Sequence, residues 1–271
     1  MPIFSIYRDF LKFLDQVNEK EGRWELYQRL YLNLHRDFLF CYWEHFTLLD
    51  LERIGERVER IRRRDYGNLL SLLQEESPEE IIEDALRSCE RVFRAPEEPA
   101  VYLIVGFFSS EGFVVKFNGH PVIGIGLERF RDFRPLGLIL AHEYCHYLRL
   151  LVGEDTEPPE RRTLGAMLLS EGLSSLFSEK VFPERPLNEH LYLSRPRLNW
   201  CISNEDYLKD LVRRELRSQR LIPALFKTGS QELGIPPRVG GYLGYRLLKR
   251  YETRTGATIS QLLNLHELPY G

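Results

Sequence analysis

Two histidines four residues apart, with a glutamate directly after the first, are the residues of this sequence best suited to chemistry. They lie in the run His142-Glu143-Tyr144-Cys145-His146. A spacing of four residues is about one helical turn, so both imidazoles project from one face and can bind one metal ion. Glu143 lies about 100° round such a helix from His142, where it can act as a base beside the metal without being a ligand. The pattern predicts metal-assisted hydrolysis.

Chance is the first alternative to this interpretation. In a chain with seven histidines the pattern would arise by accident on the order of once in a hundred. The residues before it, Leu138 to Ala141, are apolar, and polar groups placed in such a helix need partners to offset their desolvation. A hydrogen-bonded structural pair of histidines is the second alternative.

Glu171 is the leading candidate for a third ligand, since catalytic zinc usually has three protein ligands and one open position. It is a lone carboxylate within the apolar helical stretch Leu169 to Phe177, and Gly172 beside it permits a close helix approach. A surface acid is the alternative.

Other acids compete with Glu171 for this place. Glu179 lies two turns later on the same expected helix, near Lys180, where we expect it to be solvated. Solvation also explains Glu154, Asp155 and Glu157, which belong to an acidic, proline-containing loop.

The first third of the chain has a helical pattern, because apolar residues from Ile3 to about Arg94 recur at helical spacing. Ser77-Pro78-Glu79-Glu80 reads as an N-cap, a proline at the first helical position and acids in the first turn. The run from Ala95 to Pro99 then breaks the pattern. We therefore predict a helical N-terminal region, residues 1–95, and a second domain, residues 96–271.

Short β-branched and aromatic runs follow the break and predict strands. The strands are expected at residues 101–105, 113–117 and 122–127. Two apolar helices are expected over Leu136 to Val152 and Leu164 to Val181, and further helices from Asn204 to Leu268. The predicted fold class is α+β, with helices at both ends of a small mixed β-sheet and an active-site helix.

The metal-binding pattern resembles that of gluzincin-type zinc metallopeptidases, which have His-Glu-x-x-His on one helix and a glutamate ligand on the next. Glu171-Gly172-Leu173-Ser174 is similar to the signature of that second helix. More narrowly, His142-Glu143-Tyr144 with Arg149, and the later run from Gly240 to Tyr245, resemble a poorly characterised bacterial family of predicted zinc-dependent proteases. The resemblance covers roughly Val101 to Tyr251.

This resemblance implies a zincin-like domain with one Zn²⁺ ion held by His142, His146 and Glu171. It implies hydrolysis of a peptide or small protein, with Glu143 as the general base for a zinc-activated water. It also implies a sheet whose edge aligns the substrate, and residues 122–127 are the expected edge.

Two further roles follow from the resemblance. Family members often stabilise the oxyanion with a tyrosine or histidine, and Tyr242 is predicted in that place, with Tyr245 behind it. Both are open to being core aromatics instead. Some gluzincins carry an aspartate four residues after the third ligand, but here that position is Ser175, so another group must support a histidine.

Two other functions compete with the peptidase. One is a catalytically silent zinc-binding domain with a regulatory or interaction role, in which His120, His190 or His266 closes the coordination, although each is expected to be a surface histidine. The other is an interaction protein in which the helical residues 1–94 do the work.

Composition limits the partners and the compartment. A net charge of -3 gives no reason to expect nucleic acid or an anionic membrane surface. The four cysteines form no Cys-x-x-Cys pair, so reduced, mostly buried thiols are expected, and packing is the interpretation of Cys145. Charge at Arg8 and Asp9 interrupts any signal-peptide core, and no later run is apolar for the length of a bilayer. A cytoplasmic location is expected.

Overall fold

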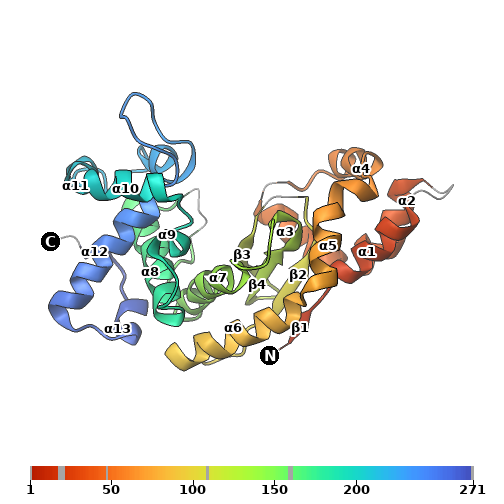
Figure 1. The fold of residues 1–271 in the computed structure, drawn as a ribbon, viewed down its shortest axis with the longest axis horizontal. Helices are drawn as coiled ribbons and strands as arrows, with labels where there is room; N and C mark the ends of the chain where they lie inside the picture. The colour runs from red at the N-terminus through yellow and green to blue at the C-terminus, as the bar shows by residue number, and fades with distance from the viewer. Residues whose placement is uncertain (1, 18–21, 47, 108–109, 158–160, 270–271) are drawn as a thin grey trace. The chain divides into compact units, whose positions relative to one another are not determined.

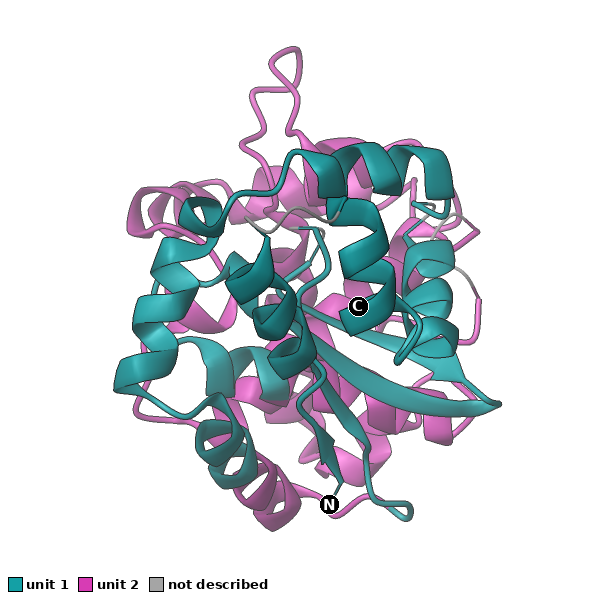
Figure 2. Ribbon diagram, turned by 90° about the vertical axis from the view of Figure 1, so that its right-hand side faces the viewer, with its two compact units in different colours: residues 1–85, 96–140 teal, residues 86–95, 141–271 magenta. Residues whose placement is uncertain are grey.

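The computed structural model describes residues 2–17, 22–46, 48–107, 110–157 and 161–269. The chain divides into two compact units, which Figure 2 colours separately. Unit 1 is residues 1–85 with 96–140, and unit 2 is residues 86–95 with 141–271. Helices α6 (Pro78–Val92) and α7 (Leu136–Leu151) each begin in unit 1 and end in unit 2. This division differs from the predicted boundary at residue 95, and separate domains over 1–95 and 96–271 stay a prediction.

Unit 1 contains a four-stranded mixed sheet with the order β1-β2-β4-β3. The strands, labelled in Figure 1, are β1 (Ile3–Phe4), β2 (Val101–Ile104), β3 (Gly112–Phe117) and β4 (His120–Gly126). β2 pairs in parallel with β1 and β4, whereas β3 and β4 form an antiparallel hairpin. Asn118 and Gly119 connect that hairpin with φ of 52° and 84°, as a two-residue turn between twisted strands requires.

Two expectations about the sheet are wrong. Residues 122–127 were expected at an edge, but β4 lies between β2 and β3 and its backbone is paired on both sides. Within the described part of the chain the edge strands are β1 and β3. The helical pattern also does not start at Ile3, since the Val101 amide donates to the Pro2 carbonyl and β1 adds to the sheet.

The predicted helices of the first third are otherwise present. They are α1 (Tyr7–Gln16), α2 (Arg23–Tyr27), the π-helical turn η1 (Gln28–Leu32), α3 (Arg36–His45), α4 (Leu51–Glu59), the 3₁₀ turn η2 (Arg63–Tyr66) and α5 (Gly67–Glu75). Buried tyrosines connect them to the end of β2, because the hydroxyls of Tyr31 and Tyr42 donate to the carbonyls of Val105 and Gly106. A single 3₁₀ turn, η3 (Leu127–Arg129), follows β4.

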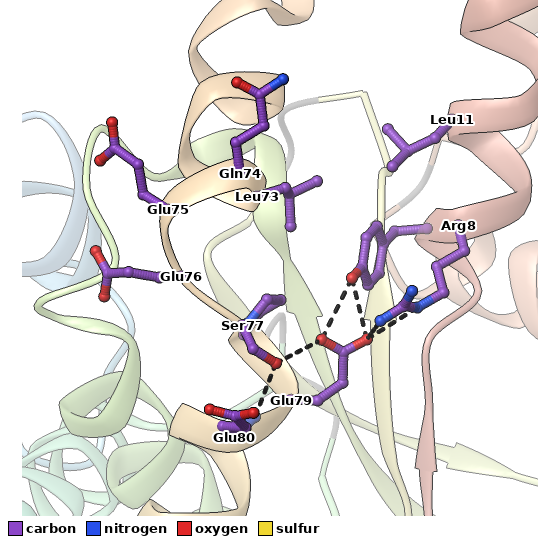
Figure 3. A pocket seen from close by; sticks show the side chains of 11 residues that line it. Arg8, Leu11, Leu73, Gln74, Glu75, Glu76, Ser77, Glu79 and Glu80 are labelled. Carbon is purple, nitrogen blue, oxygen red and sulfur yellow. Dashed lines mark hydrogen bonds and ion pairs between the residues drawn. The ribbon is translucent and has the colours of Figure 1, made fainter.

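The first turn of α6 confirms the predicted cap. The Ser77 hydroxyl accepts from the Glu80 amide at 3.3 Å. Figure 3 shows the Glu79 carboxylate turned toward Arg8. Its Oε1 atom lies 3.0 Å from the Tyr7 hydroxyl and 2.8 Å from the Arg8 guanidinium. Burial alone would raise the pKa of Glu79, but hydrogen bonds from Ser5 and Arg8 bring it below its ordinary value. The cap therefore also joins the start of α6 to α1.

Unit 2 is helical. Its elements after α7 are α8 (Leu164–Val181), α9 (Leu187–His190), α10 (Arg195–Ser203), α11 (Glu205–Val212), the π-helical turn η4 (Pro223–Lys227), α12 (Gly240–Thr255) and α13 (Ile259–Leu263). The predicted helices at 136–152 and 164–181 are confirmed, whereas α9 and α10 are new and much of 213–239 is turns. No helix of the described residues is both long enough and apolar enough to cross a bilayer.

Glycines bring α8 and α12 into backbone contact. A Cβ added to Gly172 would lie 2.3 Å from the carbonyl carbon of Gly244, and one added to Gly244 would lie 2.0 Å from the Leu168 oxygen. Real Cβ atoms do not come that close to other atoms, so only glycine fits these two positions. The pair explains both glycine-containing motifs, and it holds α12 against α8 at the residue that follows Glu171.

Candidate metal centre

Three side chains from α7 and α8 meet at one point. His142 and His146 project from the same face of α7, and their Nε2 atoms are 3.1 Å apart. Glu171 on α8 places Oε2 at 3.4 Å from His142 Nε2 and Oε1 at 3.7 Å from His146 Nε2. One donor atom from each residue lies within 4.8 Å of the other two. The structure therefore brings together the three residues predicted as ligands.

The donor spacing fits a tetrahedral ion. Ligand atoms at about 2.0 to 2.2 Å from zinc with tetrahedral angles lie roughly 3.3 to 3.6 Å from each other. The separations of 3.1, 3.4 and 3.7 Å bracket that range. Two imidazole nitrogens facing each other at this distance repel unless a proton or a cation lies between them. Two imidazoles and one carboxylate are also a donor set that zinc prefers.

Glu171 is charged in this environment. Burial would raise its pKa, but the hydrogen bond from His142 and the positive charge of the two histidines lower it to about 2. Its side chain is 32% exposed, compared with 8% for His142 and 15% for His146. The cluster is thus closed on the histidine side and open on the glutamate side.

His146 is oriented by a chain of two hydrogen bonds. The Ser170 hydroxyl lies 3.2 Å from His146 Nδ1 and donates its only proton to Asp155 Oδ2 at 2.7 Å. Ser170 must then accept from His146, which assigns the proton of the neutral imidazole to Nδ1. Nε2 is left with a free lone pair directed at the cluster. Ser170 and Asp155 thus provide the support that Ser175 does not.

Asp155 was expected to be solvated, as part of the acidic loop, and this expectation is wrong. Its side chain is only 6% exposed, so solvation does not explain it. Burial would raise its pKa, but His146 and Arg149 hold the pKa well below its ordinary value. Its backbone has a φ of 51°, a conformation that Asp tolerates better than most residues, and the Arg162 guanidinium donates to its carbonyl. The sequence signal for such a partner was Arg149, a charged residue within the apolar helix that carries the two histidines.

Glu143 lies beside the three clustered side chains without joining them. It is half-buried, and its carboxylate is not one of the three gathered donors. Burial raises the pKa of Glu143 above its ordinary value, and the positive charge of His146 and His142 offsets only part of that effect. A carboxylate of raised pKa next to a metal site has the properties of a general base.

Tyr192 is a neighbour of the site that sequence reasoning missed. Its ring meets the His142 ring edge-on, with centroids 5.3 Å apart. It follows α9 and has a φ of 51°, which is uncommon for an aromatic residue and is often found at functional sites. No motif of the sequence marks it. The other nitrogen of His142, Nδ1, is buried and has no hydrogen-bond partner among the described residues.

Tyr242 and Tyr245 are buried in α12, and their hydroxyls are bound elsewhere. Tyr242 donates to Glu205 Oε2 and Tyr245 to Glu179 Oε1, each at 2.8 Å. Glu179 also accepts from Lys249 at 2.8 Å, so it is paired, not solvated as expected, and it is not a ligand. The oxyanion role of Tyr242 stays a prediction.

The histidines considered as a fourth ligand do not join the cluster in the described part of the chain. His120 and His266 are exposed and lie near Glu97 and Glu154. His190, expected at the surface, is 0% exposed, and its Nδ1 lies 2.9 Å from the Ser178 hydroxyl. Cys145 is fully buried, and burial raises the pKa of its thiol to about 12, which agrees with a packing role.

No curated protein and no solved structure matches the chain. A family sequence profile matches residues 111–268, which include the three clustered residues and Glu143. Because this match covers more than half of the 271 residues, the chain belongs to the family described as "Predicted Zn-dependent protease (DUF2268)".

Proposed function

We propose that this chain is a zinc-dependent metallopeptidase of the gluzincin type, with one Zn²⁺ ion bound by His142, His146 and Glu171. The observation that carries the proposal is the cluster of three donors at tetrahedral spacing. Membership in a family described as predicted zinc-dependent proteases supports it. A peptide or small protein is the proposed substrate class.

The residues divide the work of hydrolysis between them. Zinc, when bound, polarises the peptide carbonyl and makes a water molecule more acidic. Glu143 accepts the proton of the attacking water and transfers it to the leaving amine. The raised pKa of Glu143 suits both steps, because the carboxylate takes a proton readily and holds it until the amine departs. Ser170 and Asp155 keep His146 in the tautomer that leaves Nε2 free to bind the ion.

An oxyanion donor completes the proposed site. Tyr242 is the residue that the resemblance suggests, but its hydroxyl is bound to Glu205. Tyr192 is supported by its ring contact with a ligand histidine. We therefore prefer Tyr192 for this role.

Metal analysis combined with substitution tests the proposal. The purified protein should hold close to one zinc per chain, and alanine at His142, His146 or Glu171 should remove it. Glu143→Gln should keep the metal and lower the turnover of a peptide library by roughly 10²- to 10⁴-fold. Glu179→Gln, two turns along α8 from Glu171, is the matched control and should change neither.

If the chain is instead a catalytically silent zinc-binding domain, a different result is expected. The chain would bind one zinc and leave a peptide library uncut in both the native protein and Glu143→Gln. If zinc content survives the loss of Glu171, the ligand assignment is wrong.

A further inference from the structure

Arg149 is a buried charge whose partners extend in two directions. It lies on α7 three residues after His146, and its side chain is 2% exposed. Toward the metal centre, Nη2 donates to Asp155 Oδ1 at 3.0 Å. Away from it, Nη1 donates to the carbonyls of Leu263 and Leu265 at 3.0 and 2.8 Å. One guanidinium thus joins two parts of unit 2.

Leu263 is the last residue of α13, and Leu265 lies just after the helix. The last carbonyls of a helix have no partner inside it and need an external donor. Arg149 supplies that donor, and the positive charge also suits the negative end of the helix. α13 itself is short and is held by a capping box at Thr258 and Gln261 and by the buried Leu262 and Leu263.

The other direction leads to a metal ligand. Asp155 accepts from Ser170, and Ser170 accepts from His146. An aspartate with 6% exposure is costly to keep charged unless a cation faces it, and Arg149 is the nearest fixed cation that contacts it. If Arg149 moves away, the charge of Asp155 is left buried without its cation. Asp155 then becomes unstable in its buried position, and the hydrogen bonds through Ser170 no longer hold His146 in its orientation.

We propose that Arg149 is a positioning residue that couples the docking of α13 to the affinity of the metal centre. The inference rests on the proposed zinc site and adds a route by which residues 263–265 act on it. Asp155, Ser170 and His146 form the path. Loosening α13 weakens metal binding, and metal binding tightens α13 by the same free energy, since coupling between two sites is reciprocal.

A zinc competition assay tests the first direction. The metal-free protein and a chromophoric chelator compete for Zn²⁺, so the readout does not depend on activity. Arg149→Met should weaken zinc binding by roughly 10- to 100-fold, the usual effect of losing an outer-shell partner. Lys249→Met removes a cation that pairs with Glu179 on α8, and this matched control should leave the affinity unchanged. Equal affinity in Arg149→Met and the native protein would overturn the proposal.

A buried leucine gives a second test that does not remove a charge. Leu263→Ala loosens α13 while keeping Arg149, and it should also weaken zinc binding. Leu208→Ala, equally buried in α11, is the control for general destabilisation. If both substitutions change the affinity equally, the effect is not specific to α13 and the coupling is refuted.

Hydrogen exchange tests the reverse direction on the unmodified chain. Adding Zn²⁺ should slow exchange of the amides at Leu262 and Leu265, which are hydrogen-bonded in α13 and just after it. Tight zinc binding with unchanged exchange of these amides would overturn the coupling and leave the proposed function intact. Failure of the native protein to bind zinc at all would instead overturn the proposed function.

Discussion

The Ser170 hydroxyl lies 3.2 Å from Nδ1 of His146, on the opposite side of that imidazole from the cluster. This contact fixes which nitrogen carries the proton, since Ser170 gives its own proton to Asp155. Ser170→Ala removes the acceptor and should weaken zinc binding by about tenfold. Chelator competition measures the effect. Ser175→Ala, on the same helix, removes only a hydroxyl bonded to the Glu171 carbonyl and should bind zinc normally; a comparable loss there would contradict the tautomer assignment.

The glycine contact between α8 and α12 predicts opposite effects for two glycines of the same motif. Gly244→Ala forces a Cβ against the Leu168 carbonyl, and overpacking of this kind costs about 1 to 3 kcal/mol or more. Gly241→Ala meets nothing within 4 Å and lies in a helix, so it should stabilise by up to about 1 kcal/mol. Denaturant unfolding of the metal-free protein measures both. Equal destabilisation by the two substitutions would show that helix contact does not explain the motif.

Much of the candidate site could be predicted from the sequence because it depends on local periodicity. The spacing of His142 and His146 fixes a shared helical face, and Glu171 stands out as a lone acid in an apolar helix. Both helices were also predicted almost to the residue, and in the structure the Thr163 hydroxyl caps the second helix by accepting from the Ala166 amide.

What could not be predicted depends on contacts distant in sequence. The polar composition of the loop around Asp155 indicates solvent, and only tertiary contact with Arg149 and Ser170 reverses that. β4 lies inside the sheet because it pairs with both β2 and β3, and periodicity within one strand does not specify its neighbours. β1 has only two residues, which is too little pattern to recognise. Tyr192 is near His142 because of a turn after α9, which no spacing rule describes.

The two candidate tyrosines can be distinguished by their effects on kcat. Tyr192→Phe should lower kcat by roughly 10²- to 10³-fold, as expected when one oxyanion donor is lost. Tyr242→Phe removes a buried hydrogen bond to a charged carboxylate, so it should cost about 1.5 to 3 kcal/mol of stability and leave kcat near normal. Steady-state kinetics and urea unfolding on each variant measure the two effects. The reverse pattern would restore Tyr242 to the oxyanion role.

The lowered pKa of Glu205 leads us to expect a lower free energy of unfolding in acid. Its carboxylate accepts from the Tyr242 hydroxyl and from Arg246, both at 2.8 Å, and pairs with Lys209. Burial would raise its pKa, but these partners lower the pKa from 4.5 to about 2. A depressed folded-state pKa means that the unfolded chain binds the proton more readily. The stabilisation is therefore complete above about pH 4.5 and is lost as the pH falls toward 2.

Glu205→Gln removes this dependence. The native protein should be more stable than the variant at pH 7, and the difference in free energy of unfolding should shrink steadily between pH 4.5 and pH 2. Urea unfolding of the metal-free proteins at several pH values measures that difference. Asp206→Asn changes the neighbouring acid, whose side chain is 96% exposed, and should give a nearly constant difference over the same range. A difference for Glu205→Gln that stays constant or grows in acid would mean that the carboxylate is not held by these partners, and the cluster around α11 and α12 would then owe its stability to packing alone.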